Sequence, residues 1–149
     1  MVLDRPPSSP LAGALIEAAA EGGDVEFLSS DAVLPRELPF SDGVRVGALV
    51  MLSGQLGVHP GTLELVPGGI EPEARQTLEN IRRVLAAHGL TLRDVVRVQV
   101  MLADMAEWPR FNEVYREFFA PPWPARSAFG ANGLALGARL ELEAFAVRR

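Results

Sequence analysis

The segment at the end of the chain, Arg139 to Val147, constrains the fold more than any other feature. One set of alternate residues is apolar, and the other set mixes carboxylates with apolar side chains: Leu140, Leu142, Ala144 and Ala146 against Glu141, Glu143, Phe145 and Val147. Alternation at a period of two is typical of a β-strand, because successive side chains point to opposite faces. The apolar face fits a protein core, whereas the mixed face suits neither core nor free solvent. We therefore expect a strand that is covered on both faces, by its own core and by another subunit.

A first helix is predicted over Pro72 to His88. Its apolar residues recur at spacings of four, three and four, which is the period of a helix with one buried face: Ala74, Leu78, Ile81 and Leu85. Pro72 opens this segment, and Gly89 follows it as a helix stop.

A second helix is predicted from about Trp108 to Phe119. A regular helix that began at Asp104 would place Pro109 where its ring clashes with the preceding turn, so we expect only a preliminary turn before Trp108. The aromatic stripe of this helix is interpreted as core: Trp108, Phe111, Tyr115 and Phe118.

Short apolar runs between turn residues predict the remaining strands. These are Val25–Leu28, a hairpin of Val44–Val46 and Leu49–Leu52 turning through Gly47 and Ala48, Val95–Leu102, and a final hairpin of Arg126–Asn132 with Arg139–Val147. From the strand at Val44–Val46 onward, the order of elements is ββαβαββ. This order predicts an α+β fold with two helices packed on one face of a mostly antiparallel sheet. We expect residues 25–149 to be one domain, preceded by an extension, residues 1–24, with a short helix at 10–21.

Composition excludes several classes of function. With 14 Lys and Arg against 19 Asp and Glu, the chain lacks the basic surface that nucleic-acid binding requires. It has no cysteine, and His59 and His88 have no partners at metal-ligand spacing, so we expect no metal and no other cofactor. The apolar stretch 11–20 is interrupted by Glu17 and is too short to span a membrane. We therefore expect a cytoplasmic protein without a signal peptide or membrane anchor.

Arg126 and Glu141 carry the most informative chemistry. An arginine presents a rigid fork of donors that matches a small carboxylate, and a glutamate can hold and deprotonate a water molecule. We expect the two residues on adjoining strands, opening into one cleft at a subunit boundary. The residues alone leave two alternatives open: an ion pair between strands, and Glu143 in place of Glu141.

Seven short blocks of this sequence resemble the reactive intermediate deaminases, the Rid family of the YjgF-like superfamily. In chain order they are Leu38–Val44, Leu52–Gln55, Pro67–Ile70, Gln76–Ile81, Phe111–Tyr115, Pro124–Ser127 and Glu141–Ala144. The resemblance implies a chorismate-mutase-like fold assembled as a homotrimer, with three ligand clefts between subunits. It implies no metal or organic cofactor.

The resemblance also implies roles for individual residues. Arg126 clamps the substrate carboxylate, and Glu141 positions the hydrolytic water. Further substrate-binding positions in the cleft are Phe40, Ser41, Gly54, Asn112 and Ala128. The chain departs from the family pattern in having Phe40 where the family usually has tyrosine, Asp42 for glutamine and Ala128 for a frequent cysteine.

The implied activity is the hydrolysis of enamine and imine intermediates, of the 2-aminoacrylate and 2-iminopropanoate type, to 2-oxo acids and ammonia. An alternative of another class is a non-catalytic, regulatory trimer that uses Arg126 to bind 2-oxo acids. The endoribonuclease activity attributed to some relatives is disfavoured by the acidic balance of the chain.

Overall fold

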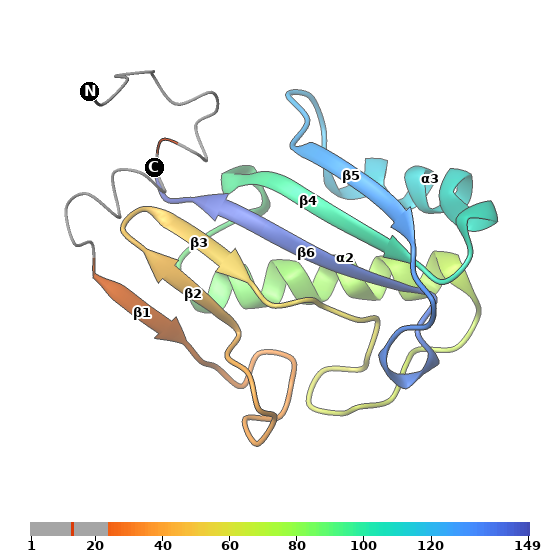
Figure 1. The fold of residues 1–149 in the computed structure, drawn as a ribbon, viewed down its shortest axis with the longest axis horizontal. Coiled ribbons are helices and arrows are strands. Elements are labelled where there is room, and N and C mark those ends of the chain that lie inside the picture. The colour runs from red at the N-terminus through yellow and green to blue at the C-terminus, as the bar shows by residue number, and fades with distance from the viewer. Residues whose placement is uncertain (1–12, 14–23) are drawn as a thin grey trace, which may run out of the picture.

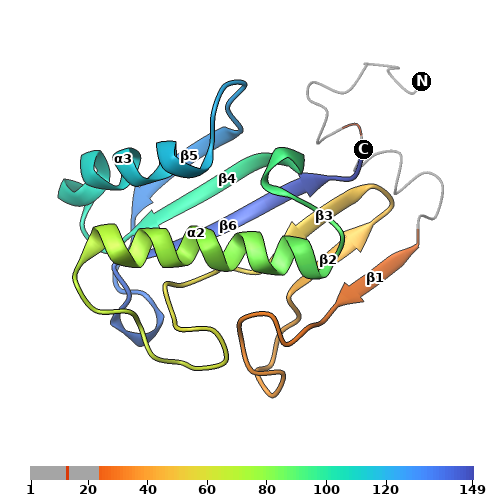
Figure 2. The same cartoon turned by 180° about the vertical axis from the view of Figure 1, so that it is seen from behind.

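The computed structural model describes residues 24–149 and, before them, Gly13 alone, so the predicted helix at 10–21 lies outside the described residues. The elements are β1 (Val25–Leu28), β2 (Gly43–Val46), β3 (Leu49–Leu52), α2 (Ile70–Ala87), β4 (Val95–Leu102), α3 (Trp108–Phe118), β5 (Ala125–Gly130) and β6 (Leu140–Val147), with 3₁₀ turns at Leu92–Asp94, Met105–Glu107 and Ala135–Gly137. The strands form one sheet in the order β1-β2-β3-β6-β4-β5. Both helices cover the same face of this sheet (Figures 1 and 2). The predicted α+β architecture is confirmed.

Local sequence signals account for most of these elements. The β2–β3 hairpin turns at Gly47, whose φ of 58° lies in the left-handed region that glycine adopts without strain. Helix α2 begins two residues earlier than expected, so Pro72 is its third residue, where a missing N–H costs nothing. The helix ends at Ala87, and Gly89, whose φ is 74°, follows the C-cap residue His88. The predicted turn before α3 is present, with Asp104 accepting a hydrogen bond from the Ala106 N–H at 2.9 Å.

The predicted final hairpin is wrong. Strand β4 lies between β5 and β6, parallel to β5 and antiparallel to β6. Helix α3 connects β4 to β5 as a crossover, which places β5 beside β4 and parallel to it. Residues 131–139 then carry the chain across the end of β4. Two strand spacings separate β5 from β6, or about 10 Å, and nine residues span this distance easily. Arg126 and Glu141 are therefore not on adjoining strands.

The core lies between the sheet and the helices. The apolar face of β6 predicted from sequence is confirmed, since Leu140, Leu142, Ala144 and Ala146 are each at most 1% exposed. The aromatic stripe of α3 is core only in part. Phe111 and Tyr115 are buried, and Phe118 is half-buried, but Trp108 is 40% exposed. The interpretation of Trp108 as core was wrong because this first residue of α3 lies beside a surface hollow rather than over the sheet.

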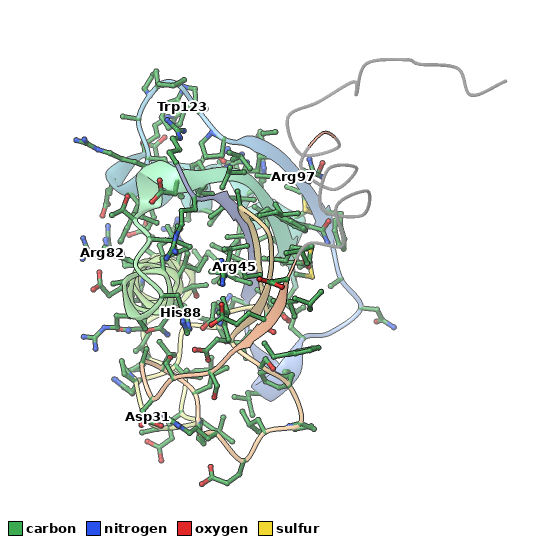
Figure 3. All side chains as sticks on the ribbon, turned by 90° about the vertical axis from the view of Figure 1, so that its left-hand side faces the viewer. Asp31, Arg45, Arg82, His88, Arg97 and Trp123 are labelled. Carbon is green, nitrogen blue, oxygen red and sulfur yellow. The ribbon has the colours of Figure 1, made fainter. Side chains whose placement is uncertain are left out.

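The face of the sheet opposite the helices, here called the open face, mixes apolar and polar side chains. By strand register it carries Phe27, Val44, Met51, Arg97, Gln99, Met101, Phe129, Glu141, Glu143 and Phe145. Phe27 is 72% exposed and Phe129 is 44% exposed. Figure 3 views the sheet edge-on, with Arg97 on this open side and Arg82 on the outer side of α2. Neither of the two described α-helices covers the open face. No helix among the described residues is long and apolar enough to cross a membrane.

Candidate functional site

Glu141 lies on the open face and lines a hollow of about 740 Å³, here called the acid hollow. The predicted residues Phe40, Ser41 and Gly54 line the same hollow, together with Glu143. Gly54 makes room for the Glu141 carboxylate, because a Cβ atom at position 54 would lie 2.0 Å from Oε1 of Glu141. Glycine is therefore required at position 54 for close approach, and this carboxylate packs directly against the backbone.

Strand β6 is fixed on both sides of Glu141. The buried carboxylate of Glu73, in the first turns of α2, accepts a hydrogen bond of 2.6 Å from the Arg139 N–H. Gln55 and Leu142 exchange backbone hydrogen bonds of 2.8 and 3.1 Å. Since Glu141 stands between these two points of attachment, its backbone has one register relative to Gly54.

Burial raises the pKa of Glu141, and the negative charge of Glu143 raises it further. A raised pKa brings a carboxylate closer to the range in which it exchanges protons with substrate or water near neutral pH. Glu141 therefore suits proton transfer better than a fully hydrated glutamate does.

A chain of side chains supports the wall formed by Phe40 and Ser41. The hydroxyl of Ser53 donates to the Ser41 carbonyl at 2.6 Å. The neighbouring Asp42 carboxylate accepts a hydrogen bond from Ser30 and lies 2.9 Å from Nε2 of His88, which caps the C-terminus of α2. Sequence reasoning missed this contact, since its partners stand 46 positions apart and neither belongs to a motif.

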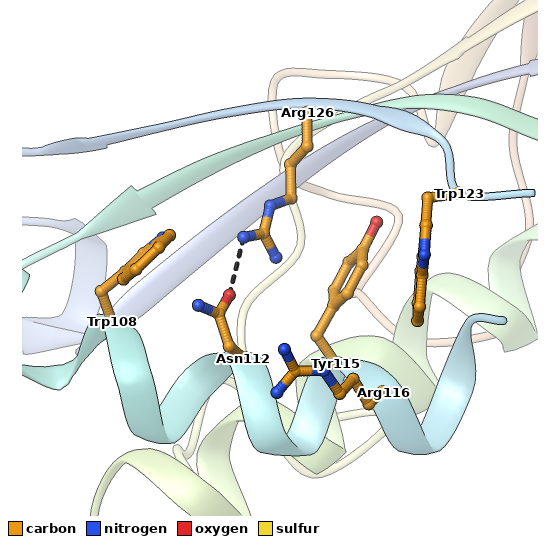
Figure 4. Close-up of a pocket in the computed structure, with 6 residues that line it drawn as sticks. All are labelled: Trp108, Asn112, Tyr115, Arg116, Trp123 and Arg126. Carbon is orange, nitrogen blue, oxygen red and sulfur yellow. Dashed lines mark hydrogen bonds between the residues drawn. The ribbon is translucent and has the colours of Figure 1, made fainter. Parts of the chain in front are cut away.

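Arg126 lies on the opposite face of the sheet, in a second hollow of about 330 Å³, here called the arginine hollow (Figure 4). Its Nη2 donates to Oδ1 of Asn112 at 2.6 Å, and its guanidinium carbon lies 4.7 Å from the ring centroid of Tyr115. Within residues 24–149, no carboxylate comes within 4.0 Å of Arg126. Burial lowers the pKa of Arg126, although a guanidinium stays charged at neutral pH. A partly buried cation with unused donors can bind an anion.

The two hollows are separate within one chain. Arg126 is in register with Val98 of β4, whose partner on β6 is Ala144, so Arg126 shares the helix-covered face with these core residues. Glu141 is in register with Met101, whose partner on β5 is Phe129, and these residues belong to the open face. The expectation that Arg126 and Glu141 open into one cleft therefore does not hold inside a single chain.

The other predicted site residues divide between the hollows. Asn112 joins Arg126, while Phe40, Ser41 and Gly54 join Glu141. Ala128 lines neither hollow, because it faces the helices and packs against the core. Sequence reasoning missed Trp108 and Trp123 in the arginine hollow. Trp123 stands three residues before Arg126, so proximity in the chain was an available signal.

No group of three or more His, Asp or Glu side chains in the described part of the chain is arranged to hold a metal ion. The arginine hollow offers a cation, and the acid hollow offers a carboxylate with a raised pKa.

Comparison with known proteins finds a matching family and similar solved structures. The family described as endoribonuclease L-PSP matches residues 31–148. The chain is 42% identical over 110 residues to 2-iminobutanoate/2-iminopropanoate deaminase of Bos taurus, covering 74% of this chain and 80% of the bovine protein. Among solved structures it is similar to the yeast protein YEO7, with a TM-score of 0.80, 35% identity and coverage of 85% of this chain and all of the yeast chain. It is also similar to E. coli TdcF with bound serine, with a TM-score of 0.76, 33% identity and coverage of 83% and 99%.

Proposed function

Because the chain belongs to the endoribonuclease L-PSP family, which is the family of the YjgF and Rid proteins, we propose that it hydrolyses 2-imino acids to 2-oxo acids and ammonia at clefts between subunits. The relatives named 2-iminobutanoate/2-iminopropanoate deaminase, at about 40% identity over most of the chain, support this activity. The TdcF structure with bound serine supports a ligand that carries a small carboxylate. We include in this proposal a cytoplasmic location and residues 25–149 as the catalytic domain.

The observation that carries the proposal is the division of the required chemistry between two faces of one chain. Arg126 offers free donors for a carboxylate, and Glu141 offers a carboxylate with a raised pKa, yet each hollow holds only one of them. A heterologous, ring-closing interface repeats the same contact around a rotation axis, so each interface joins one face of a subunit to a different face of the next. A homotrimer closed in this way has three clefts, each with Arg126 from one subunit and Glu141 from its neighbour.

The open face supports such an assembly. In the single chain Phe27 is 72% exposed and Phe129 is 44% exposed, and both lie on the same face as Glu141. Exposed aromatic side chains on a continuous sheet face are typical of a protein–protein contact. Strand β5, which carries Arg126, is at the edge of the sheet and so can reach a neighbouring subunit.

The reaction follows from these groups. The substrate carboxylate accepts hydrogen bonds from Arg126, which fixes the imine carbon in the cleft. Glu141 of the neighbouring subunit, in its ionised form, accepts a hydrogen bond from a water molecule and takes its proton as the oxygen adds to the imine carbon. As the C=N bond becomes a single bond, the protonated imine nitrogen becomes the amino group of a carbinolamine. Glu141 then returns its proton to this nitrogen, and ammonia leaves as the hydroxyl group gives up its proton and the C=O bond forms. One water is consumed for each ammonia released.

The test is an assay with 2-aminoacrylate generated in place by a serine dehydratase, with pyruvate formation followed over time. We expect the wild type to accelerate pyruvate release. Arg126→Ala will lower kcat/KM by about 100-fold or more, because the reacting carbon is no longer held in place. Glu141→Gln will keep carboxylate binding but lower kcat by about 100-fold or more, since the amide cannot accept the proton.

Two surface variants serve as matched controls. Arg110→Ala removes an exposed arginine of α3 and Glu64→Gln removes an exposed glutamate, and neither residue lines a hollow. Both should retain the wild-type rate. A wild-type protein that binds 2-oxo acids but leaves the spontaneous rate of several imino acids unchanged would instead be a non-catalytic binder.

A further inference from the structure

Both tryptophans of the chain line the arginine hollow. Trp108 is the first residue of α3, and Trp123 precedes β5. Figure 4 shows them on opposite sides of Arg126, with Tyr115 between Arg126 and Trp123. They are 40% and 48% exposed, although tryptophan is usually far more buried. Two exposed indole rings on either side of Arg126 give this hollow apolar walls next to a charged group.

The aromatic wall on the Trp123 side is held in place by stacking. The rings of Tyr115 and Trp123 are nearly parallel, at 26°, with centroids 6.4 Å apart. The ring of Phe119 also stacks on that of Tyr115, with centroids 4.7 Å apart. Stacked aromatic rings stabilise one another, so Trp123 is pre-organised to receive a further ring.

The size of the arginine hollow exceeds that of the smallest imino acids. At about 30 Å³ for each water-sized atom group, 330 Å³ accommodates roughly 11 non-hydrogen atoms. The imino acid derived from alanine has about six such atoms, and the one derived from phenylalanine has about twelve, counted from their formulas at the same scale. The smaller molecule leaves about half of the hollow filled by water, whereas the larger one fills it.

The charges in the arginine hollow favour an apolar side chain over an acidic one. Of the two arginines that line the hollow, Arg126 has no carboxylate within 4.0 Å among the described residues, and it is assigned to the substrate carboxylate. The second cation, Arg116, donates to Oε1 of Glu113 at 2.9 Å. An acidic side chain would have to compete with Glu113 for Arg116, while an aromatic side chain needs only the indole walls.

From this arrangement we propose that the protein prefers imino acids with a large aromatic side chain, and that Trp108 and Trp123 determine this specificity. The inference rests on the proposed function, since the hollow that receives the side chain adjoins the arginine that holds the substrate carboxylate. The reaction is unchanged: water adds to the imine carbon, and ammonia leaves to give the aromatic 2-oxo acid.

The first experiment compares two substrates, each produced in place by an L-amino acid oxidase and oxygen, from phenylalanine and from alanine. We expect the wild type to have a kcat/KM at least about tenfold higher for the phenylalanine-derived imine. Trp108→Ala and Trp123→Ala should each lower that value by about tenfold while changing the value for the alanine-derived imine by less than about threefold. Leu63→Ala, which removes another exposed apolar side chain, should change neither.

The outcomes separate the two claims. Hydrolysis of the alanine-derived imine with no preference for the aromatic one overturns the specificity and leaves the function standing. Loss of both activities in the wild type overturns the function, and binding then tests the hollow by itself.

For binding, the tryptophan fluorescence of Trp108 reports the arginine hollow, because Trp108 lines no other hollow, whereas Trp123 also borders the one beside Phe119; Trp123→Phe isolates the Trp108 signal. Phenylpyruvate should quench it with a Kd at least about tenfold lower than that of pyruvate. Equal Kd values overturn the inference whatever the activity. If an alanine variant fails to fold, Trp108→Phe and Trp123→Phe, which keep a smaller ring, should give intermediate preferences, and unchanged preferences would overturn the inference.

Discussion

Replacing Gly54 by alanine will displace the Glu141 carboxylate without unfolding the protein. The new Cβ would lie 2.0 Å from Oε1 and 2.9 Å from Cδ of Glu141. Carbon atoms essentially never approach an oxygen more closely than about 3 Å without a bond, so the carboxylate must move by about 1 Å or rotate away. The obstructed atoms belong to the end of a flexible side chain, which moves at little cost.

The expected effects on activity and stability are therefore very different. A displacement of about 1 Å in a catalytic group lowers the rate by about 100-fold, which corresponds to roughly 2.7 kcal/mol of transition-state stabilisation. The backbone of Gly54 is outside the left-handed region, so alanine fits it without strain. Glycine-to-alanine replacement at a compatible position changes the free energy of unfolding by about 1 kcal/mol or less.

The assay measures kcat/KM for imine hydrolysis and the midpoint of urea unfolding on the same samples. Gly130→Ala is the matched control, because its Cβ would come no closer than 3.3 Å to the side chain of Met105. Gly54→Ala should lose activity at near-wild-type stability, and Gly130→Ala should keep both. Wild-type kcat/KM in Gly54→Ala would show that the position of the Glu141 carboxylate does not matter for the reaction.

Of three further predictions, two concern the supports of the site and one concerns its chemistry. Burial raises the pKa of Glu73 above its ordinary value of 4.5, and the N–H groups of Arg139 and Leu140 lower it by less than burial raises it. The folded state therefore binds a proton at Glu73 more tightly than the unfolded state does. The contribution of Glu73 to stability must then decrease as the pH rises above 4.5. Relative to Glu73→Gln, the wild type should lose Tm between pH 4.5 and 7.5, and a constant or growing difference would contradict this. Asp42→Ala removes the carboxylate that contacts Ser30 and His88, so it should lower the free energy of urea unfolding by about 1–3 kcal/mol. It should also raise KM, because the wall of the acid hollow at Ser41 loosens. Unchanged stability and KM would show that Asp42 does not support this wall. Excess EDTA should leave the hydrolysis rate unchanged, and inhibition restored by added metal would contradict the mechanism drawn from Arg126 and Glu141 alone.

Much of the fold could be predicted from local patterns. The period of α2, the glycine turn at Gly47 and the alternation in β6 each reflect forces that act within a few residues, and each element lies where the pattern indicates. The pairing of strands depends on long-range contacts instead. Residues 126–132 and 139–147 read as a hairpin because they are neighbours in sequence, while the crossover through α3 places β4 between them.

The candidate site shows the same limit. The residue types at Arg126 and Glu141 indicated carboxylate binding and proton transfer, but their faces depend on the register of β4 with both neighbours. A one-residue change in register moves a side chain to the other face, and no pattern within a single strand fixes it. The helical period could not predict the exposure of Trp108 either, because the hollow beside it is completed by Trp123 and Arg126, which follow α3 in the chain.

The claim that one catalytic site is shared between subunits can be tested by mixing two inactive variants. Arg126→Ala and Glu141→Gln are denatured together in equal amounts and refolded, with each variant refolded alone as a control. In a ring assembled at random, about one cleft in four receives Arg126 from one subunit and Glu141 from its neighbour. We predict about a quarter of wild-type activity in the mixture and almost none in either control. A mixture that forms mixed oligomers but stays inactive would contradict a shared catalytic site.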